Sequence, residues 1–135
     1  MKVALVAHGD NASNVKDLFY REGFDLIEKE CTTEKEYIEL LKDADGALIY
    51  IHPPTTRKVM EESNHLKVIS RGGVGVDSVD LDAATELGVC VCNTPGVNTT
   101  EVADHAMALL LTITRKITEQ NELVKKGSWV DRTEL

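Results

Sequence analysis

The stretch whose residue types and spacing best fit a binding or catalytic role is a glycine-rich loop, RGGVGVDSVD, at residues 71–80. Gly73 and Gly75 after an apolar run fit the start of a dinucleotide-binding fingerprint, which needs a third glycine three residues further on. Ser78 stands there, so the fingerprint is incomplete. Two other interpretations remain open. The glycines could turn backbone N–H groups outward to form a nest for a small anion such as a carboxylate, or the loop is only a flexible turn between a strand and a helix.

Potential metal ligands are sparse along the chain. Cys90 and Cys92 alternate on an expected strand, so they face the same side, where we expect small buried residues. No second cysteine pair accompanies them. Glu101 and His105 lie one helical turn apart, but an inverted zinc motif needs histidine where the glutamate stands. We therefore predict no metal site.

The bulk composition argues against several kinds of partner. The 23 acidic and 15 basic residues give a net charge of −8, which repels polyanions such as nucleic acid. The longest apolar runs are far shorter than the roughly 18 residues that span a bilayer. Three cysteines, an odd number, without a charged-then-apolar leader favour a reduced cytoplasmic setting over a disulfide framework. We predict one soluble domain with no nucleic-acid or membrane partner.

The elements that must position the glycine loop alternate between strand and helix, which favours right-handed crossovers and a parallel sheet. The expected fold is a flavodoxin-like α/β domain, an open five-stranded sheet with flanking helices, in which ligands bind beyond the carboxyl ends of the strands. Segments 52–56 and 71–77 fall on that rim. The expected strands lie at 1–7, 24–28, 47–51, 66–70 and 89–93, and the expected helices at 15–22, 33–41, 57–65 and 82–87.

A long helix is predicted from Thr99 to about Glu119, and its middle is apolar on most sides. Such a helix must be buried on most sides, whereas an exposed apolar surface of this kind marks an interface. We therefore predict a homodimer through helix 99–119, with or without exchange of the helices.

The run KVISRGGVGVDSVDLDAATELGVCVCNTPGVNTTEVADHAMALLL, residues 67–111, resembles the D-isomer-specific 2-hydroxyacid dehydrogenases, a family that includes phosphoglycerate dehydrogenase. The resemblance implies an NAD-dependent oxidoreductase that transfers a hydride between NAD(H) and a 2-hydroxy or 2-oxo acid. It covers the chain well from about Gly46. On this basis residues 1–98 form the substrate domain, and residues 99–135 form a linker and dimerisation helix that leads towards an NAD-binding domain.

The resemblance assigns roles in the glycine loop. In such enzymes the loop that matches Val74 and Gly75 offers backbone N–H groups to the substrate carboxylate, and the arginine that matches Arg71 lies beside it. This agrees with the anion-nest interpretation, which rests on the glycines alone.

Further roles follow around the loop. The asparagine that matches Asn98 sits near the substrate and the nicotinamide, and the residues that match Thr100 and Val102 approach the nicotinamide side. Asn98 also has a simpler interpretation, because asparagine is a common helix-start residue. At the end of the third strand, His52 and residues 55–57 are candidates for specificity contacts.

A full member of the family continues from a tryptophan like Trp129 into the glycine loop that holds NAD. Its catalytic histidine, carboxylate and arginine also lie in that further part. We therefore assign no catalytic residue, and we expect this chain alone to be inactive and not to bind NAD tightly. The phosphoglycerate branch tends to have an arginine where Tyr50 or Ile51 stands here, which disfavours phosphoglycerate as the substrate.

A second class of function stays open beside the dehydrogenase. The chain could be a stand-alone dimeric module that binds small carboxylates or a partner without catalysis. Such a module would keep the anion nest and the dimerisation helix but not the redox chemistry.

Overall fold

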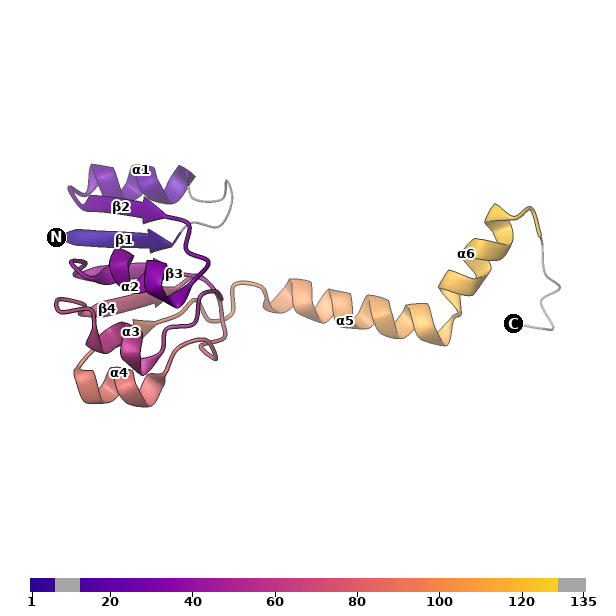
Figure 1. Cartoon of the computed structure of the whole chain (residues 1–135). Helices are drawn as coiled ribbons and strands as arrows, with labels where there is room; N and C mark the ends of the chain where they lie inside the picture. Colours follow the sequence, from indigo (N-terminus) through magenta and orange to yellow (C-terminus); the bar gives the residue numbers. More distant parts are fainter. Residues whose placement is uncertain (7–12, 129–135) are drawn as a thin grey trace. The chain divides into compact units, whose positions relative to one another are not determined.

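The computed structural model in Figure 1 describes residues 1–6 and 13–128. The chain divides into two compact units, with the boundary between Val97 and Asn98. In the first unit the strands are β1 (Lys2–Val6), β2 (Asp25–Lys29), β3 (Gly46–Ile49), β4 (Val68–Arg71) and β5 (Cys90–Cys92). Its helices are α1 (Ser13–Arg21), α2 (Glu34–Leu41), α3 (Arg57–Glu61) and α4 (Leu81–Leu87). The second unit contains α5 (Thr99–Thr114) and α6 (Ile117–Lys125).

The sheet has the strand order β2-β1-β3-β4-β5, and every neighbouring pair is parallel. This confirms the predicted open α/β sheet and its flavodoxin-like order. The chain moves one way from β1 to β2 and the opposite way afterwards, so right-handed crossovers place α1 on one face and α2, α3 and α4 on the other. The carboxyl ends of β3, β4 and β5 bring the segments that follow them to one rim.

The main core lies between the sheet and helices α2, α3 and α4. Small residues and branched aliphatic residues of β1, β3 and β4 face this side, as expected for strands buried under helices. Tyr37 of α2 is the largest fully buried side chain in it. The cluster consists of Ala4, Val6, Cys31, Tyr37, Leu40, Leu41, Ala44, Ala47, Ile49, Val59, Met60, Leu66, Ile69, Val79, Ala83, Ala84 and Val89.

Local capping explains where the core helices begin and end. Thr33 and Glu36 form a capping box at the start of α2, in which each side chain accepts from the other's backbone N–H. The Thr56 hydroxyl caps α3 by accepting from the N–H of Val59, without a reciprocal bond. Helix α4 ends at Gly88, whose φ of 71° lies in the left-handed region that glycine adopts without strain.

The cysteine pair on β5 differs from the expectation. Cys90 and Cys92 do share one side of the strand, with their Sγ atoms 4.0 Å apart, but both side chains are exposed. The prediction that they would be buried is wrong, because β5 is the last strand of the sheet and the core cluster lies against its other face, at Val91.

The predicted single helix over 99–119 is also corrected, because α5 ends at Thr114 and α6 begins at Ile117. Lys116 between them has a left-handed φ of 49°. The hydroxyls of Thr112 and Thr114 bond back to the carbonyls of Ala108 and Leu110, a pattern that weakens and bends helices.

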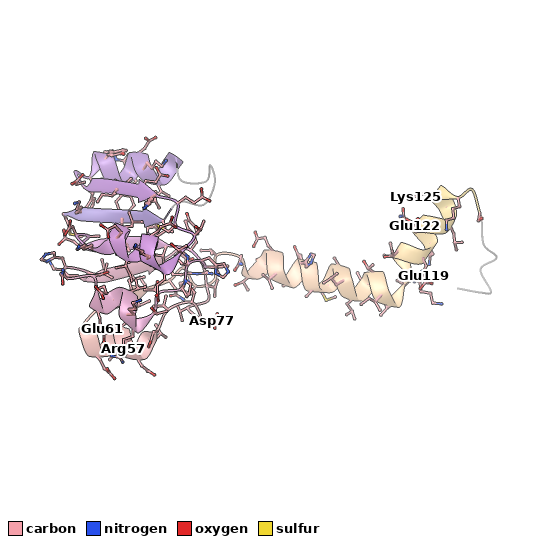
Figure 2. The ribbon with its side chains drawn as sticks, in the orientation of Figure 1. Arg57, Glu61, Asp77, Glu119, Glu122 and Lys125 are labelled. Carbon is pink, nitrogen blue, oxygen red and sulfur yellow. The ribbon has the colours of Figure 1, made fainter. Side chains whose placement is uncertain are left out.

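The described part of α6 has a polar surface that includes Glu119, Glu122 and Lys125 (Figure 2). Lys125 and Glu122 form an ion pair at 3.3 Å. Among residues 1–6 and 13–128, no helix combines the length and the apolar character that a membrane span requires.

Candidate functional site

The glycine loop leaves the carboxyl end of β4 and is tied at once to β3. The N–H of Gly72 donates to the carbonyl of Ile49 at 2.8 Å. The ring of Tyr50 lies against Gly72, since a Cβ on this glycine would be only 2.9 Å from the ring atom Cε1. A residue with a side chain would push the ring away, so glycine allows β3 and β4 to end side by side.

The far end of the loop is tied to the segment after β3 through Thr55. The N–H of Thr55 donates to the carbonyl of Ser78 at 2.7 Å, and the N–H of Asp80 donates to the carbonyl of Thr55 at 3.0 Å. The Thr55 side chain is 1% exposed and lies 2.8 Å from the phenol oxygen of Tyr37. Thr55 therefore faces the core, and the expectation that it contacts a ligand is wrong.

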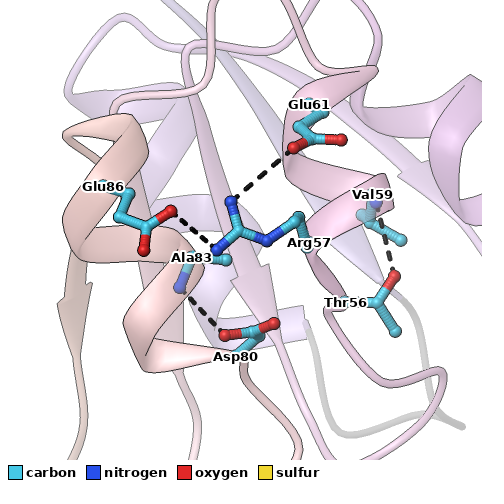
Figure 3. Close-up of polar contacts among 7 residues, drawn as sticks. All are labelled: Thr56, Arg57, Val59, Glu61, Asp80, Ala83 and Glu86. Atoms are coloured by element: carbon cyan, nitrogen blue, oxygen red, sulfur yellow. Dashed lines mark hydrogen bonds and ion pairs between the residues drawn. The ribbon is translucent and has the colours of Figure 1, made fainter.

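Other rim candidates are also held in contacts between helices. Figure 3 shows the guanidinium of Arg57 turned towards α4, where it meets Glu86 at 2.8 Å, and towards Glu61 at 3.7 Å. The Thr56 hydroxyl donates to Glu34 at 3.0 Å. These side chains join α2, α3 and α4. They are not directed at the glycine loop.

His52 is exposed and lies in the segment that follows β3. Its peptide bond to Pro53 is cis. Unlike Thr56 and Arg57, its side chain forms no hydrogen bond or ion pair between helices in the described part of the chain. Its predicted role as a specificity contact stays a prediction.

The centre of the loop is held from the segment that follows β5. The carbonyl of Gly73 accepts from the N–H of Thr94 at 3.0 Å, and the carbonyl of Val74 accepts from Nδ2 of Asn93 at 2.7 Å. Within the described residues, the N–H groups of Val74 and Gly75 donate to no acceptor. Two successive free N–H donors on a glycine-rich loop are what an anion nest requires.

Charged side chains flank these two donors. The guanidinium of Arg71 folds over Gly73 and already occupies the position that a Cβ there would take. Its Nε is buried without a hydrogen-bond partner in the described chain. The Asp77 carboxylate, labelled in Figure 2, lies near Gly75, with one oxygen 2.8 Å from where a Cβ would stand. The loop therefore has a cation beside Gly73 and a carboxylate beside Gly75.

Three predicted site residues belong to the second unit. Asn98 occupies the N-cap position of α5, but its side chain makes no capping hydrogen bond. The predicted helix start at Asn98 is thus confirmed, and its predicted place near the substrate stays a prediction. Thr100 and Val102 lie in the first turns of α5, and both are exposed. Their predicted roles near the nicotinamide stay predictions.

The glycine loop does not fit the pyrophosphate of NAD. In a dinucleotide site the loop opens directly into a helix whose free N-terminus binds phosphate. Here α4 begins only at Leu81, and its N-terminus is capped by the Asp80 carboxylate, which accepts from the N–H of Ala83 at 2.9 Å (Figure 3). A phosphate would have to displace this carboxylate and would be repelled by its charge.

Asn93 contacts the glycine loop but is not among the residues that the sequence motifs indicate. The sequence nevertheless contains a weak signal for it. Asn93 is the last residue of the predicted fifth strand and directly follows β5 in the structure, and parallel strands end at a common rim. A polar side chain at that position can reach the loop after the neighbouring strand. In residues 1–6 and 13–128, no group of three or more His, Cys, Asp or Glu side chains is placed to hold a metal ion.

Comparison with known proteins identifies the family. Residues 5–127 match the family described as D-isomer specific 2-hydroxyacid dehydrogenase, catalytic domain. The chain belongs to this family. The sequence resemblance is thereby confirmed, and the description of the family is that of dehydrogenases specific for one isomer of 2-hydroxy acids.

Individual members of the D-2-hydroxyacid dehydrogenase family give the degree of similarity. D-3-phosphoglycerate dehydrogenase of Methanocaldococcus jannaschii is 41% identical over 97 residues, which are 72% of this chain and 18% of that protein. The enzyme of the same name from Synechocystis is 33% identical over 122 residues, 85% of this chain and 22% of that protein. The chain thus spans about a fifth of the length of these curated relatives.

Solved structures share the fold of this chain. An acyclic imino acid reductase, Bsp5, in complex with NADPH and D-Arg, has a TM-score of 0.87 at 25% identity, over 100% of this chain and 44% of that one. NAD-dependent formate dehydrogenase from Staphylococcus aureus, in complex with NAD, has a TM-score of 0.79 at 29% identity, over 96% of this chain and 43% of that one.

Proposed function

We propose that this chain is the substrate-domain portion of an NAD-dependent D-2-hydroxyacid dehydrogenase of the phosphoglycerate dehydrogenase-like kind. The reaction of the whole enzyme is hydride transfer between NAD(H) and a 2-hydroxy or 2-oxo acid. The observation that carries the proposal is the pair of N–H groups at Val74 and Gly75, which have no acceptor among the described residues and lie beside the Arg71 guanidinium at the rim of the sheet. Family membership and the names of the relatives support it.

The residues of this chain bind and orient the acid in this proposal. The Val74 and Gly75 N–H groups hold its carboxylate, and Arg71 supplies a positive charge next to it. Charge-assisted hydrogen bonds of this kind are about twice as strong as neutral ones. His52 contacts the substituent that distinguishes one acid from another, and Asn98 lies near the reacting carbon.

NAD(H) supplies or accepts the hydride, and in this proposal its nicotinamide side approaches Thr100 and Val102. Its pyrophosphate needs groups other than the glycine loop, because Asp80 caps the helix that follows the loop. We therefore expect the 135-residue chain alone to bind 2-oxo acids weakly, to bind NADH weakly and to show no turnover.

A titration followed by amide NMR tests the proposal. Pyruvate, glyoxylate, hydroxypyruvate and 3-phosphoglycerate are added separately to the labelled chain, with acetone as a neutral control. The Val74 and Gly75 amide signals should shift with at least one acid and not with acetone. Micromolar binding of NADH, or acids that shift only signals remote from the loop, would contradict the assignment.

A second candidate function has its own supporting observation. Large apolar side chains of α5, including Met107, Leu110 and Ile113, are half exposed or more. Such a surface fits an interface between two copies of the chain. The alternative is therefore a dimeric small-carboxylate-binding or interaction module without catalysis. The reading frame after codon 135 separates the two, since an in-frame stop with normal expression favours the module.

We also propose a cytoplasmic location. The cysteines of the described chain, Cys31, Cys90 and Cys92, are all free thiols. Two of them are exposed, and exposed thiols persist in a reducing compartment. Fractionation of cells that express the chain would test the location.

A further inference from the structure

We propose that Asn93 is a positioning residue that aims the Gly75 N–H at the substrate carboxylate. The inference rests on the proposed function of the glycine loop. Its basis is the hydrogen bond from Nδ2 of Asn93 to the carbonyl of Val74 at 2.7 Å, across 19 residues of sequence. The neighbouring carbonyl, that of Gly73, is held by the main chain of Thr94 at 3.0 Å.

The geometry of the peptide unit turns these two bonds into control of the donors. A peptide unit is planar and trans, so its C=O and the N–H of the next residue point in opposite directions. Holding the Val74 carbonyl towards Asn93 therefore directs the Gly75 N–H away from it. Holding the Gly73 carbonyl towards Thr94 does the same for the Val74 N–H. The segment after β5 thus orients both donors of the nest.

Only one of these two contacts depends on a side chain. The Thr94 contact comes from the backbone and survives most substitutions. The Asn93 contact needs an amide donor, because an aspartate at this position would present an acceptor to the Val74 carbonyl. Glycines at 72, 73 and 75 leave the loop free to adopt other orientations. The Asn93 side chain therefore selects the orientation of the Val74–Gly75 peptide.

The experiment compares the wild-type chain with Asn93→Ala and Asn93→Asp in the same pyruvate and glyoxylate titrations. Asn64→Asp, at an exposed turn residue, is the matched control for added negative charge. Loss of one hydrogen bond should weaken binding roughly three- to ten-fold in Asn93→Ala. Asn93→Asp should lose more, because its carboxylate repels both the Val74 carbonyl and the ligand. Asn64→Asp should bind like wild type.

A second measurement needs no ligand. The scalar coupling across the hydrogen bond, between Asn93 Nδ2 and the Val74 carbonyl carbon, should be present in wild type, and the Gly75 amide signal should move or broaden in Asn93→Ala. These signals separate orientation of the loop from general folding, which the remaining amide spectrum reports.

The outcomes are distinct for the two proposals. Undiminished acid binding in both Asn93 variants would overturn the positioning role while leaving the proposed function intact. If the wild type binds no acid, the proposed carboxylate site fails. The orientation of the peptide is then judged by the coupling and by the Gly75 amide signal. A Gly75 signal that is unchanged in Asn93→Ala overturns the inference, and a changed one supports it.

Discussion

The phenol oxygen of Tyr37 lies 2.8 Å from Oγ1 of Thr55, and both side chains are almost fully buried, at 0% and 1% exposure. Through its main chain, Thr55 pairs with Ser78 and Asp80 at the exit of the glycine loop. A hydrogen bond inside the core therefore fixes the segment after β3 and, through it, one end of the candidate site.

Removing both partners of this pair should destabilise the chain by less than the sum of the two single removals. Tyr37→Phe or Thr55→Val leaves a buried hydroxyl without its partner, which costs about 1–3 kcal/mol. The double variant removes both hydroxyls, so its free energy of unfolding should fall by less than the sum of the single losses. Urea unfolding measures all three. Thr85→Val, which removes an exposed helix hydroxyl, is the control, and strictly additive losses would contradict coupling between Tyr37 and Thr55.

The same tyrosine predicts how stability depends on alkaline pH. Burial raises the pKa of Tyr37 to about 12, and the bond to Thr55 offsets only part of this effect. In the unfolded chain tyrosine ionises near pH 10. The stabilisation linked to the neutral phenol is thus complete below about pH 10 and is lost as the pH rises towards 12.

Tyr37→Phe removes this titration. The free energy of unfolding of the variant, followed by urea unfolding across the alkaline range, should fall less steeply than that of wild type. Parallel curves for the two proteins would contradict the assignment of the alkaline loss to Tyr37.

Gly73→Ala should impair ligand binding while changing stability little. An alanine Cβ would displace the Arg71 guanidinium, which is the end of a flexible side chain and can move at low cost. We expect a change in the free energy of unfolding within about 0.5 kcal/mol. Binding of pyruvate or glyoxylate should weaken several-fold, because Arg71 no longer lies beside the nest.

Gly88→Ala is the matched control, because it should show the reverse. Gly88 has a left-handed φ of 71° and lies at the end of α4, away from the loop. Alanine there costs about 1–2 kcal/mol of stability and should leave acid binding unchanged. If Gly73→Ala lost stability and kept its affinity, the proposed role of Arg71 would be wrong.

The elements of the fold could be predicted because their signals are local. Apolar runs indicated all five strands, and the helices expected at 33–41 and 82–87 lie within one residue of the bounds of α2 and α4. The contacts that shape the site could not, since the Tyr37–Thr55 and Asn93–Val74 bonds join residues 18 and 19 positions apart. Such partners depend on how neighbouring strands are aligned and where each ends, which the pattern of a single segment does not specify.

Two local features could also not be predicted from the sequence pattern. Whether Cys90 and Cys92 are buried or exposed depends on which face of an outer strand is covered, and the apolar character of the strand does not indicate which face that is. The end of α5 at Thr114 depends on side-chain hydroxyls that bond back to the helix, which an apolar periodicity does not register.

Acid should weaken the start of α2. Hydrogen bonds to the Glu36 carboxylate lower its pKa from about 4.5 to about 2. The largest effect comes from the backbone N–H of Thr32, followed by the side chains of Thr33 and Thr32 and the backbone of Thr33. The stabilisation from its charged form is present above about pH 4.5 and is lost as the pH falls through about 2. Glu36→Gln should flatten this acid limb in thermal unfolding, with Glu39→Gln, outside the capping box, as the control. Equal acid dependence in the two variants would contradict the role of Glu36.

The apolar surface of α5 gives the last prediction, that the chain is a homodimer in solution. Leu110 and Ile113 are 53% and 76% exposed, and residues three positions apart lie on one helix face. Burial of such side chains between two copies contributes about 1.5–3 kcal/mol for each one that is fully covered. A charge placed among them would lose this gain and would also have to be desolvated.

Leu110→Asp and Ile113→Asp should therefore each convert a dimer into a monomer in multi-angle light scattering at micromolar concentration. Leu87→Asp, an equally drastic change at an exposed leucine of α4, should leave the dimer intact. Because α5 buries none of its own residues within the described chain, the variants should keep the far-ultraviolet circular dichroism of wild type. A wild-type chain that is monomeric under these conditions would refute the predicted interface.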